Sequence, residues 1–180
     1  LADRAVDLLS FGGCGALIVN TVDRAQKLYV ELRNRLGQDV KILLFHARFP
    51  ADERAGLEQA VLSCFGPEGD RPQRALLVAT QVAEQSLDID FDFMLSDLAP
   101  VDLLLQRAGR LHRHVRQRPL MHSDACLWVA GLQPERLPEL KETAWSYVYD
   151  AYILGRTWAL LCREELLQLP ADIDRLVQAV

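Results

Sequence analysis

The feature that most constrains the fold of this chain is a series of short apolar runs. They occupy residues 16–19, 40–45, 75–79, 91–96 and 126–130. Short, continuous apolar runs are typical of strands that are buried on both faces. Strands of this kind that alternate with helices predict an α/β fold, a three-layer domain with a mainly parallel sheet.

Helical periodicity fills most of the sequence between and after these runs. It predicts helices over residues 1–11, 22–36, 50–64, from 101 through 113, 141–169 and 171–180. We expect one domain over residues 1–133 and a helical extension that packs on it over residues 134–180. The aromatic residues of 141–169 are expected to pack on the core rather than stack on bases. Because the chain starts and stops inside helical patterns, we expect it to be an excised fragment of a longer protein.

Polar residues follow three of the predicted strands at the point where each strand ends. They are Asn20-Thr21, His46-Ala47-Arg48 and Thr80-Gln81. In open α/β sheets, ligands bind at the carboxyl ends of the strands. A hydroxyl such as that of Thr21, at the start of a helix, suits a phosphate, although it also suits a simple helix cap.

A basic segment follows Pro100, where the pattern changes to helical period. Gln106, Arg110 and Arg113 are spaced i, i+4 and i+7, so we expect them to share one helix face. Two arginines one turn apart can grip a polyphosphate, because a guanidinium group is planar, always charged and forks onto phosphate oxygens. Gly109 between them lets a phosphate come close. We expect both guanidinium groups to face the ligand-bearing carboxyl edge of the sheet. The alternative is a solvated surface with weak ion pairs.

Charge and composition indicate which kinds of ligand and partner the chain can bind. The net charge of −5 does not indicate nucleic-acid binding, but residues 107–118 hold five arginines, two histidines and no acid. A local basic ridge on an acidic body suits a phosphate site. The four cysteines form no CxxC pair and indicate buried thiols in the cytoplasm. No apolar stretch approaches membrane-spanning length, so no membrane partner is expected.

Several sequence patterns partly match the signatures of phosphate loops, dinucleotide-binding sites or metal sites, and we expect none of these sites in the chain. The glycine cluster at 12–15 precedes a strand and lacks Gly-Lys-Ser/Thr, so it predicts a turn, and the dinucleotide pattern Gly-x-Gly-x-x-Gly is missing. The alternating carboxylates at 88, 90 and 92 resemble a metal face. We expect a loop there, with the later two capping or pairing. The spacings of the histidines fit no structural zinc pattern, so no metal is expected.

Two longer segments carry a resemblance to a known family. The segment Gln106-Arg107-Ala108-Gly109-Arg110-Leu111-His112-Arg113 resembles motif VI of superfamily 2 helicases, and Ala79–Asp90 resembles their motif V. The segment around Thr21 is similar to motif IV, and His46 with Arg48 is similar to the His-Ser-Arg element. Together, the two long segments resemble the helicase–nuclease of type I CRISPR systems, which unwinds and degrades DNA marked by a guide-RNA complex.

The resemblance implies a fold and a set of roles. The fold is the second RecA-like domain of a two-domain motor (P-loop NTPase fold, helicase C-terminal type). Arg110 and Arg113 would be arginine fingers for the γ-phosphate, and Gln106 would sense it or place the attacking water. The nucleotide would also contact Asp88, Gly109 and Arg107, the last of which also supports the helix. One DNA strand would be held through its phosphates by Thr21, His46, Arg48, Thr80 and Gln81.

The resemblance also implies partners and an incomplete active site. ATP and Mg²⁺ would be held mainly by the first RecA-like domain, because no phosphate loop, DExH box or His-Asp nuclease motif occurs here. The partners would be single-stranded DNA, the first RecA-like and nuclease domains of the same protein, and a guide-RNA surveillance complex of antiviral defence. We therefore expect the chain alone to bind no cofactor and to be inactive. The alternatives are a domain of another superfamily 2 DNA or RNA helicase, or a non-catalytic docking module. One departure from the motif V pattern is Ser86, where many relatives have Gly.

Overall fold

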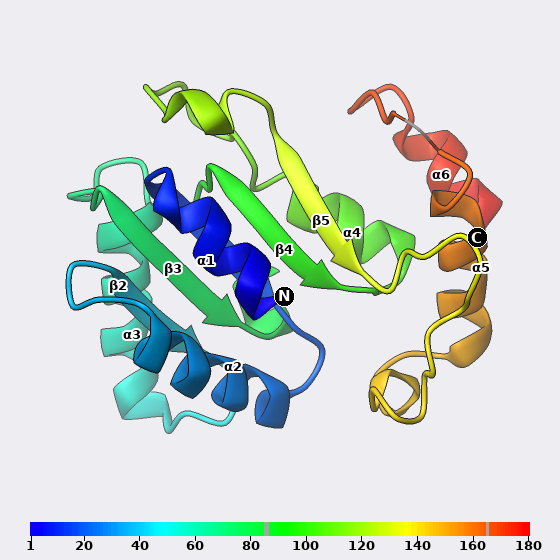
Figure 1. Cartoon of the computed structure of the whole chain (residues 1–180), viewed down its shortest axis with the longest axis horizontal. Coiled ribbons are helices and arrows are strands. Elements are labelled where there is room, and N and C mark those ends of the chain that lie inside the picture. The colour runs from blue at the N-terminus through cyan, green and yellow to red at the C-terminus, as the bar shows by residue number, and fades with distance from the viewer. Residues whose placement is uncertain (85–86, 165) are drawn as a thin grey trace.

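A parallel sheet forms the centre of the molecule. The computed structural model describes residues 1–84, 87–164 and 166–180, and of Glu84 the backbone alone. Within them, five strands pair in the order β2-β3-β1-β4-β5, and every neighbouring pair runs parallel. The strands are β1 (Gly13–Ile18), β2 (Lys41–Phe45), β3 (Arg74–Ala79), β4 (Phe93–Asp97) and β5 (Cys126–Ala130). Because the strands run in one direction, β1 to β4 end along one border of the sheet, which we call the carboxyl edge (Figure 1).

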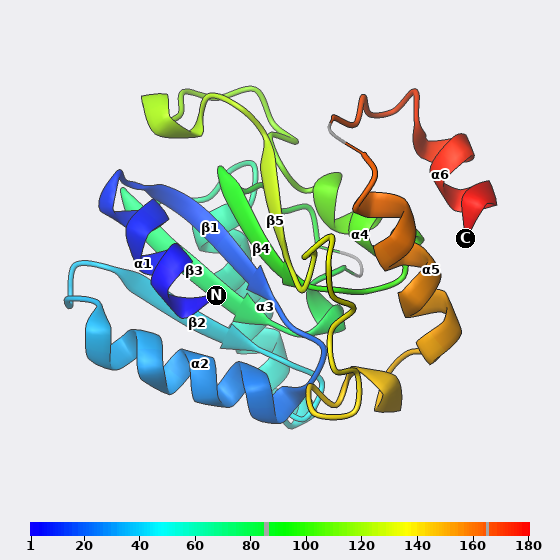
Figure 2. The same cartoon turned by 45° about the vertical axis from the view of Figure 1, so that its right-hand side comes forward.

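Helices cover both faces of the sheet, so the three-layer α/β prediction is confirmed. In Figure 1, α1 (Ala2–Ser10) and α2 (Val22–Arg35) lie in front of the sheet, and α3 (Ala51–Phe65) and α4 (Val101–Ala108) lie behind it. The last helices, α5 (Ala151–Leu161) and α6 (Ile173–Ala179), lie to the side of β5 (Figure 2). Three short 3-10 helices complete the described elements: η1 (Gln81–Glu84), η2 (Leu120–His122) and η3 (Trp145–Tyr147).

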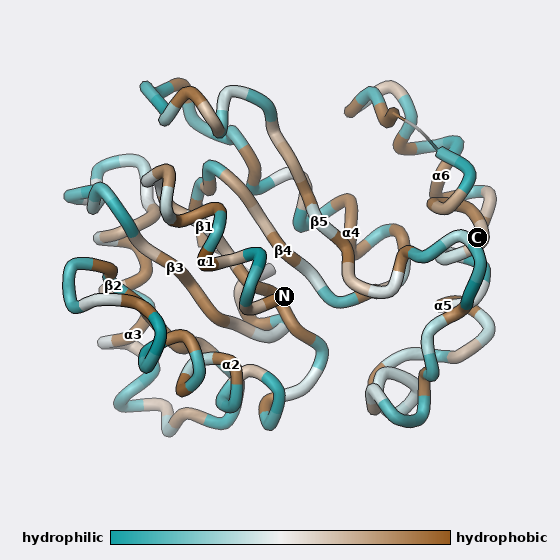
Figure 3. The backbone as a smooth tube through the Cα atoms, in the orientation of Figure 1, coloured by the Kyte–Doolittle hydropathy of each residue, from teal (hydrophilic) through white to brown (hydrophobic). Residues whose placement is uncertain are grey.

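Apolar side chains of the strands form a core on each face. One cluster lies between the sheet and α1 and α2, and a second packs the opposite face against α3. A third joins α4 to the extension through Leu104, Trp145 and Leu154. Figure 3 shows the central strands in brown between helices with teal outer turns. Residues of the extension therefore pack against α4. The boundary between a domain over residues 1–133 and an extension over residues 134–180 stays a prediction.

The strand β1 begins earlier than its apolar run predicted. Gly12 and Gly13 have φ of +83° and +96°, a region that glycine adopts without strain. The turn that the sequence predicted over residues 12–15 is limited to its start, because Gly13 to Gly15 belong to β1. Pairing with β3 then extends β1 back to Gly13, which lies opposite Arg74. Gly15 lies opposite Phe93 on β4, where a Cβ atom would approach the Phe93 ring to 2.2 Å. The glycines therefore permit both the turn and close contact with an aromatic ring.

Two predicted helices are shorter than their periodicity indicated. The helix after Pro100 ends at Ala108, so the prediction that Gln106, Arg110 and Arg113 share one helix face is wrong. The reason is a contact distant in sequence: the Phe91 amide donates to the Arg110 carbonyl, and the His112 amide donates to the Phe91 carbonyl. The predicted helix over 141–169 is also interrupted. Ala144 has φ of +59°, and α5 starts only after Asp150.

Candidate nucleotide and nucleic-acid sites

The carboxyl edge holds the residues predicted to contact DNA. Thr21 is the N-cap of α2, where its Oγ1 atom accepts a hydrogen bond from the Arg24 amide at 3.3 Å. Thr80 follows β3 and is buried, and its amide donates to the Phe45 carbonyl at the end of β2. Thr21 is only partly buried, so its hydroxyl remains within reach of a ligand at this edge.

The turn after β2 presents one accessible cation. His46 is 3% exposed and stacks on Phe49 with ring centroids 4.2 Å apart. Burial lowers the pKa of His46, and the charge of Arg48 acts in the same direction. Both effects favour the neutral imidazole, so His46 is less suited than a cation to pair with a phosphate. Arg48 is exposed, so it is the residue of this turn that is available to an anion.

Gln81 links the carboxyl edge to the C-terminal extension. Its Nε2 atom donates to the Asn20 carbonyl at 3.1 Å and to the Tyr149 hydroxyl at 3.0 Å. Asn20 is buried, and its side chain donates to the Leu98 carbonyl at 2.8 Å. Gln81 thus bridges the loops that follow β1 and β3, and it contacts a residue that the sequence did not assign to either site.

A buried carboxylate beneath this edge was also missed from the sequence. Asp97 accepts hydrogen bonds from the Asn20 amide at 3.1 Å and from Trp145 Nε1 at 3.2 Å. It also lies 3.1 Å from Arg24 Nε on α2. Burial raises the pKa of Asp97, and the charge of Arg24 opposes that shift. Asp97 therefore ties the start of α2 to the extension, a role that only the contacts of distant segments reveal.

The second group of predicted site residues lies around Asp88. Arg113 Nε lies 2.7 Å from Asp88 Oδ1, and His114 Nε2 lies 3.1 Å from the same oxygen. The Arg113 and Asp88 side chains are 46% and 53% exposed. The Arg113 guanidinium holds the pKa of Asp88 below its usual value. Arg110 is partly buried and donates to the Leu87 carbonyl. The structure therefore brings Asp88, Arg110 and Arg113 together at an accessible surface.

This group lies away from the carboxyl edge, so the expectation that both guanidinium groups face that edge is wrong. Arg110 and His112 bond to Phe91, which precedes β4 in the chain. Because α4 starts at the end of β4 and runs back along the sheet, the residues after its last turn reach the amino end of that strand. The two predicted sites are therefore at opposite ends of α4.

The other residues of the motif VI segment have different environments. Arg107 is 1% exposed, and its guanidinium donates to Ser96 Oγ at 2.6 Å and to the Tyr149 hydroxyl at 3.4 Å. The predicted nucleotide contact of Arg107 conflicts with this burial, whereas the predicted support of the helix agrees with it. Gln106 and Gly109 are exposed at the end of α4. Gly109 has φ of −65°, so its backbone does not require glycine.

A charge cluster next to the Asp88 group holds the loop in place. Arg118 forms ion pairs with Asp90 and Asp92, Arg71 with Asp92 at 2.9 Å, and Arg116 with Asp90 at 3.0 Å. Both carboxylates are buried. Burial would raise the pKa of Asp92, but the Cys14 amide and Arg71 outweigh it and lower the pKa. Asp90 and Asp92 pair with arginines, so the three alternating carboxylates do not form a metal face.

Other features carry no part of either site. Within the described residues, no cluster of three or more His, Cys, Asp or Glu side chains is arranged to hold a metal ion. Every described helix is too short or too polar to cross a bilayer. Cys14 and Cys64 are buried, whereas Cys126 and Cys162 are only partly so.

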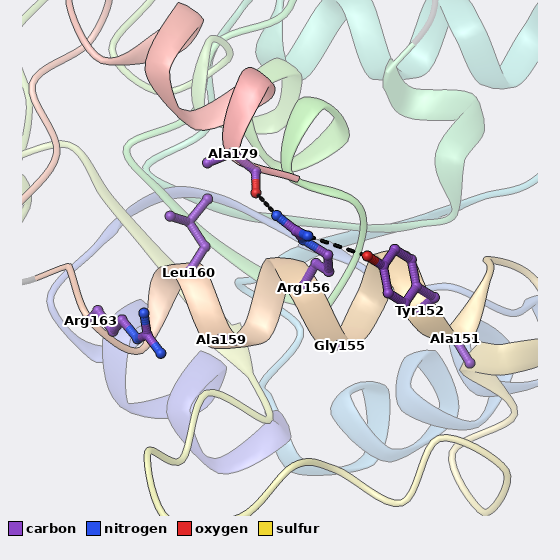
Figure 4. Close-up of a pocket in the computed structure, with 8 residues that line it drawn as sticks. All are labelled: Ala151, Tyr152, Gly155, Arg156, Ala159, Leu160, Arg163 and Ala179. Atoms are coloured by element: carbon purple, nitrogen blue, oxygen red, sulfur yellow. Dashed lines mark hydrogen bonds between the residues drawn. The ribbon is translucent and has the colours of Figure 1, made fainter.

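A pocket beside α5 is lined by Tyr152 and Arg156, with Ala179 from α6 (Figure 4). The departure at Ser86 lies outside the described residues.

Comparison with known proteins identifies relatives of nearly the whole chain. The family model for the C-terminal part of the CRISPR-associated nuclease/helicase Cas3 matches residues 11–116. The chain is 44% identical to the CRISPR-associated endonuclease/helicase Cas3 of Thermus thermophilus, over 94% of this chain and 22% of that protein. It is 43% identical to the CRISPR-associated nuclease/helicase Cas3 of Streptococcus thermophilus, over 100% of this chain and 19% of that protein. The chain therefore spans about a fifth of the length of these relatives.

Solved structures agree with the sequence relatives. The crystal structure of T. fusca Cas3-AMPPNP superimposes with a TM-score of 0.89 at 42% identity, covering 98% of this chain and 21% of that chain. A chain of a CRISPR RNA-guided surveillance complex, pre-nicking, superimposes with a TM-score of 0.76 at 38% identity, covering 92% of this chain and 21% of that chain. The parallel sheet with helices on both faces is thus a RecA-like helicase fold. Because the family model covers more than half of its residues, the chain belongs to the Cas3 C-terminal family of CRISPR-associated nuclease/helicases.

Proposed function

We propose that this chain is the second RecA-like domain of an ATP-dependent, single-strand-translocating DNA helicase–nuclease of CRISPR interference. The observation that carries the proposal is the accessible group of Arg110, Arg113 and Asp88 at the end of α4. Two guanidinium groups and one carboxylate suit the phosphates and the ribose of a nucleotide that another domain presents. A solved relative is named with AMPPNP, an ATP analogue, which supports a nucleotide as the ligand.

Arg110 and Arg113 would act as arginine fingers. Charge develops on the γ-phosphoryl group during transfer, and a guanidinium group placed beside it stabilises that charge. In the domain described here, Arg113 is paired with Asp88 and Arg110 with the Leu87 carbonyl. Closure of the cleft between the two RecA-like domains would move both guanidinium groups from these partners onto phosphate oxygens, while Gln106 places the attacking water or senses the phosphate. When bound, Mg²⁺ would neutralise phosphate charge, and we assign its ligands to the first domain.

The carboxyl edge would hold one DNA strand. We assign the phosphate contacts to Arg48, Thr21 and Gln81, because these three predicted residues have accessible surface. The other two, His46 and Thr80, are 3% exposed, so we give them the role of supporting the edge from below. Contacts to phosphates carry little sequence information, and a translocase must pass over any sequence.

The loop between β3 and β4 would couple the two sites. It leaves the carboxyl edge at Thr80, passes Asp88 beside Arg113, and reaches the amino end of β4 at Asp92. Opening or closing of the nucleotide cleft would therefore move the residues of the carboxyl edge that contact DNA. A motor that moves stepwise along a DNA strand needs such a link between its two sites. The family match favours this motor over another superfamily 2 helicase and over a docking module. The further partners would be the nuclease domain of the same protein and, as for a solved relative, a guide-RNA surveillance complex.

ATP turnover of the intact protein and of this chain alone tests the proposal. We expect single-stranded DNA of any sequence to stimulate turnover by the intact protein, with an affinity that falls as salt rises. We expect no turnover from the isolated chain, because a nucleotide-binding half is missing from it. DNA-stimulated turnover by the isolated chain, or an intact protein indifferent to DNA, would overturn the proposal.

A further inference from the structure

A tyrosine of the C-terminal extension contacts both the DNA edge and the motif VI helix. The Tyr149 hydroxyl accepts hydrogen bonds from Gln81 Nε2 at 3.0 Å and from the Arg107 guanidinium at 3.4 Å. Gln81 belongs to the carboxyl edge, and Arg107 lies in the last turn of α4. A phenol oxygen can accept two donors. One hydroxyl group therefore joins elements from both sides of the proposed coupling path, although it lies outside the segment that the family model matches.

The extension is anchored at the same place by a second side chain. Trp145 is 2% exposed, and its Nε1 atom donates to Asp97, which also accepts from the Asn20 amide. In Figure 2 the yellow segment that follows β5 passes along the ends of the strands before it enters α5. Residues 145–149 thus reach the loop after β1 through Asp97 and the loop after β3 through Gln81.

The environment of these contacts makes them sensitive to small movements. Arg107 is almost fully buried, so each of its donors needs a partner inside the protein. Its contact with Ser96 fixes the guanidinium to β4, and its contact with Tyr149 extends that link to the extension. A shift of Gln81 on DNA binding would change the hydrogen bonds of Tyr149, and through them the position of α4, whose end carries Arg110 and Arg113.

We propose that Tyr149 is a positioning residue that couples DNA at the carboxyl edge to the nucleotide-facing end of α4. This inference rests on the proposed function, because it assigns DNA to one end of α4 and nucleotide to the other. Tyr149 contacts neither ligand itself and acts through Gln81 and Arg107. Its removal should therefore weaken the stimulation of turnover by DNA rather than the chemistry of the active site.

The test compares DNA-stimulated with DNA-free ATP turnover in the intact protein. Tyr149→Phe removes the hydroxyl and keeps the ring that packs beside Trp145 and Leu154. We expect the ratio of the two turnover rates to fall by about threefold to tenfold, because the change breaks the link from Gln81 through the hydroxyl to Arg107. Because Tyr149→Phe also takes a hydrogen-bond acceptor from the buried Arg107 guanidinium, its melting temperature should fall below that of the control Tyr147→Phe, an exposed tyrosine two residues away, while its DNA-free turnover stays at the control's rate. In a Gln81→Met background, Tyr149→Phe should have no further effect on the ratio.

The outcomes separate this inference from the proposed function. If wild-type turnover responds to DNA and the Tyr149→Phe ratio equals the wild-type ratio, the coupling role of Tyr149 is overturned and the motor assignment stands. A variant that lowers the melting temperature and both rates equally, with an unchanged ratio, also overturns it, since that result describes a purely structural residue. A wild-type protein that does not respond to DNA overturns both.

Discussion

At the scale of single residues, the motif VI segment contains arginines with opposite environments. Arg107 is buried against Ser96, whereas Arg113 lies at the surface beside Asp88. The residue type is the same, so the sequence cannot separate them by composition. The separation arises because the chain leaves the helix after Ala108, between the two arginines. The burial of Arg107 indicates a structural role, whereas the exposure of Arg113 leaves it accessible for the role toward a nucleotide that we propose.

The first prediction contrasts these two arginines in the stability of the chain. Arg107→Ala leaves buried acceptors such as the Ser96 hydroxyl without their donor, and we expect it to lower the free energy of unfolding by about 3 kcal/mol. Arg113→Ala should leave that free energy nearly unchanged, because exposed ion pairs contribute little. Urea unfolding of both variants measures the difference. Equal losses would mean that the environments described for the two arginines are incorrect.

The second prediction concerns two glycines with different surroundings. A Cβ atom at Gly15 would lie 2.2 Å from the Phe93 ring, whereas one at Gly56 in α3 would meet nothing within 4 Å. We expect Gly15→Ala to destabilise the chain by about 1–3 kcal/mol through overpacking. Gly56→Ala should stabilise it by about 0.5–1 kcal/mol, because alanine favours the helix. Thermal unfolding of the pair checks both signs, and a stabilising Gly15→Ala would show that β1 and β4 pair differently.

At the scale of elements, the charge cluster joins two segments that flank the group of Asp88, Arg110 and Arg113. Asp90 and Asp92 end the loop between β3 and β4, and Arg116 and Arg118 follow the motif VI segment. Their ion pairs are largely buried, so loss of one partner leaves an uncompensated charge. The cluster therefore fixes the spacing between Asp88 on one segment and Arg113 on the other.

The third prediction is a dependence of stability on acid that originates in this cluster. The pKa of Asp92 is lowered in the folded chain from an ordinary value of 3.8. Below pH 3.8 the unfolded chain binds more protons at this group than the folded chain, so the free energy of unfolding falls as the pH falls. We expect Asp92→Asn to be less stable at neutral pH and to lose less stability between pH 5 and pH 3.

A matched control for this prediction is Asp124→Asn, at an exposed position of the loop before β5. It should show the same loss of stability between pH 5 and pH 3 as the wild-type chain. Chemical denaturation at several pH values measures all three proteins. An Asp92→Asn curve parallel to that of the wild-type chain would contradict the shifted pKa.

At the scale of the whole molecule, the sheet was the most predictable part. Each apolar run became a strand, because a strand buried on both faces carries a continuous local signal. The end of α4 was not predictable in this way. Leu111 continues the helical period, but its segment turns to pair with Phe91, a contact with residues 20 positions earlier. Helical spacing alone contains no information about such a partner.

The site was predictable to the extent that its residues share local motifs. Asp88, Arg110 and Arg113 meet as a group, but their position at the amino end of β4 depends on the early end of α4. The contacts of Tyr149 and Trp145 join segments 42–68 positions apart in the sequence. No spacing rule links such residues, so the role of the extension emerges only from the folded chain.

The most direct test of the central claim is the ATP turnover of the intact protein, saturated with single-stranded DNA, after Arg110→Ala or Arg113→Ala. The control is Arg136→Ala, which removes an exposed arginine paired with Glu139. We expect each of the two variants to lose turnover by about a thousandfold or more. The melting temperatures of both variants should equal that of the control, and the control should keep the turnover of the wild-type protein. Near-normal turnover in a folded Arg110→Ala or Arg113→Ala protein would contradict the assignment of these two guanidinium groups to the nucleotide.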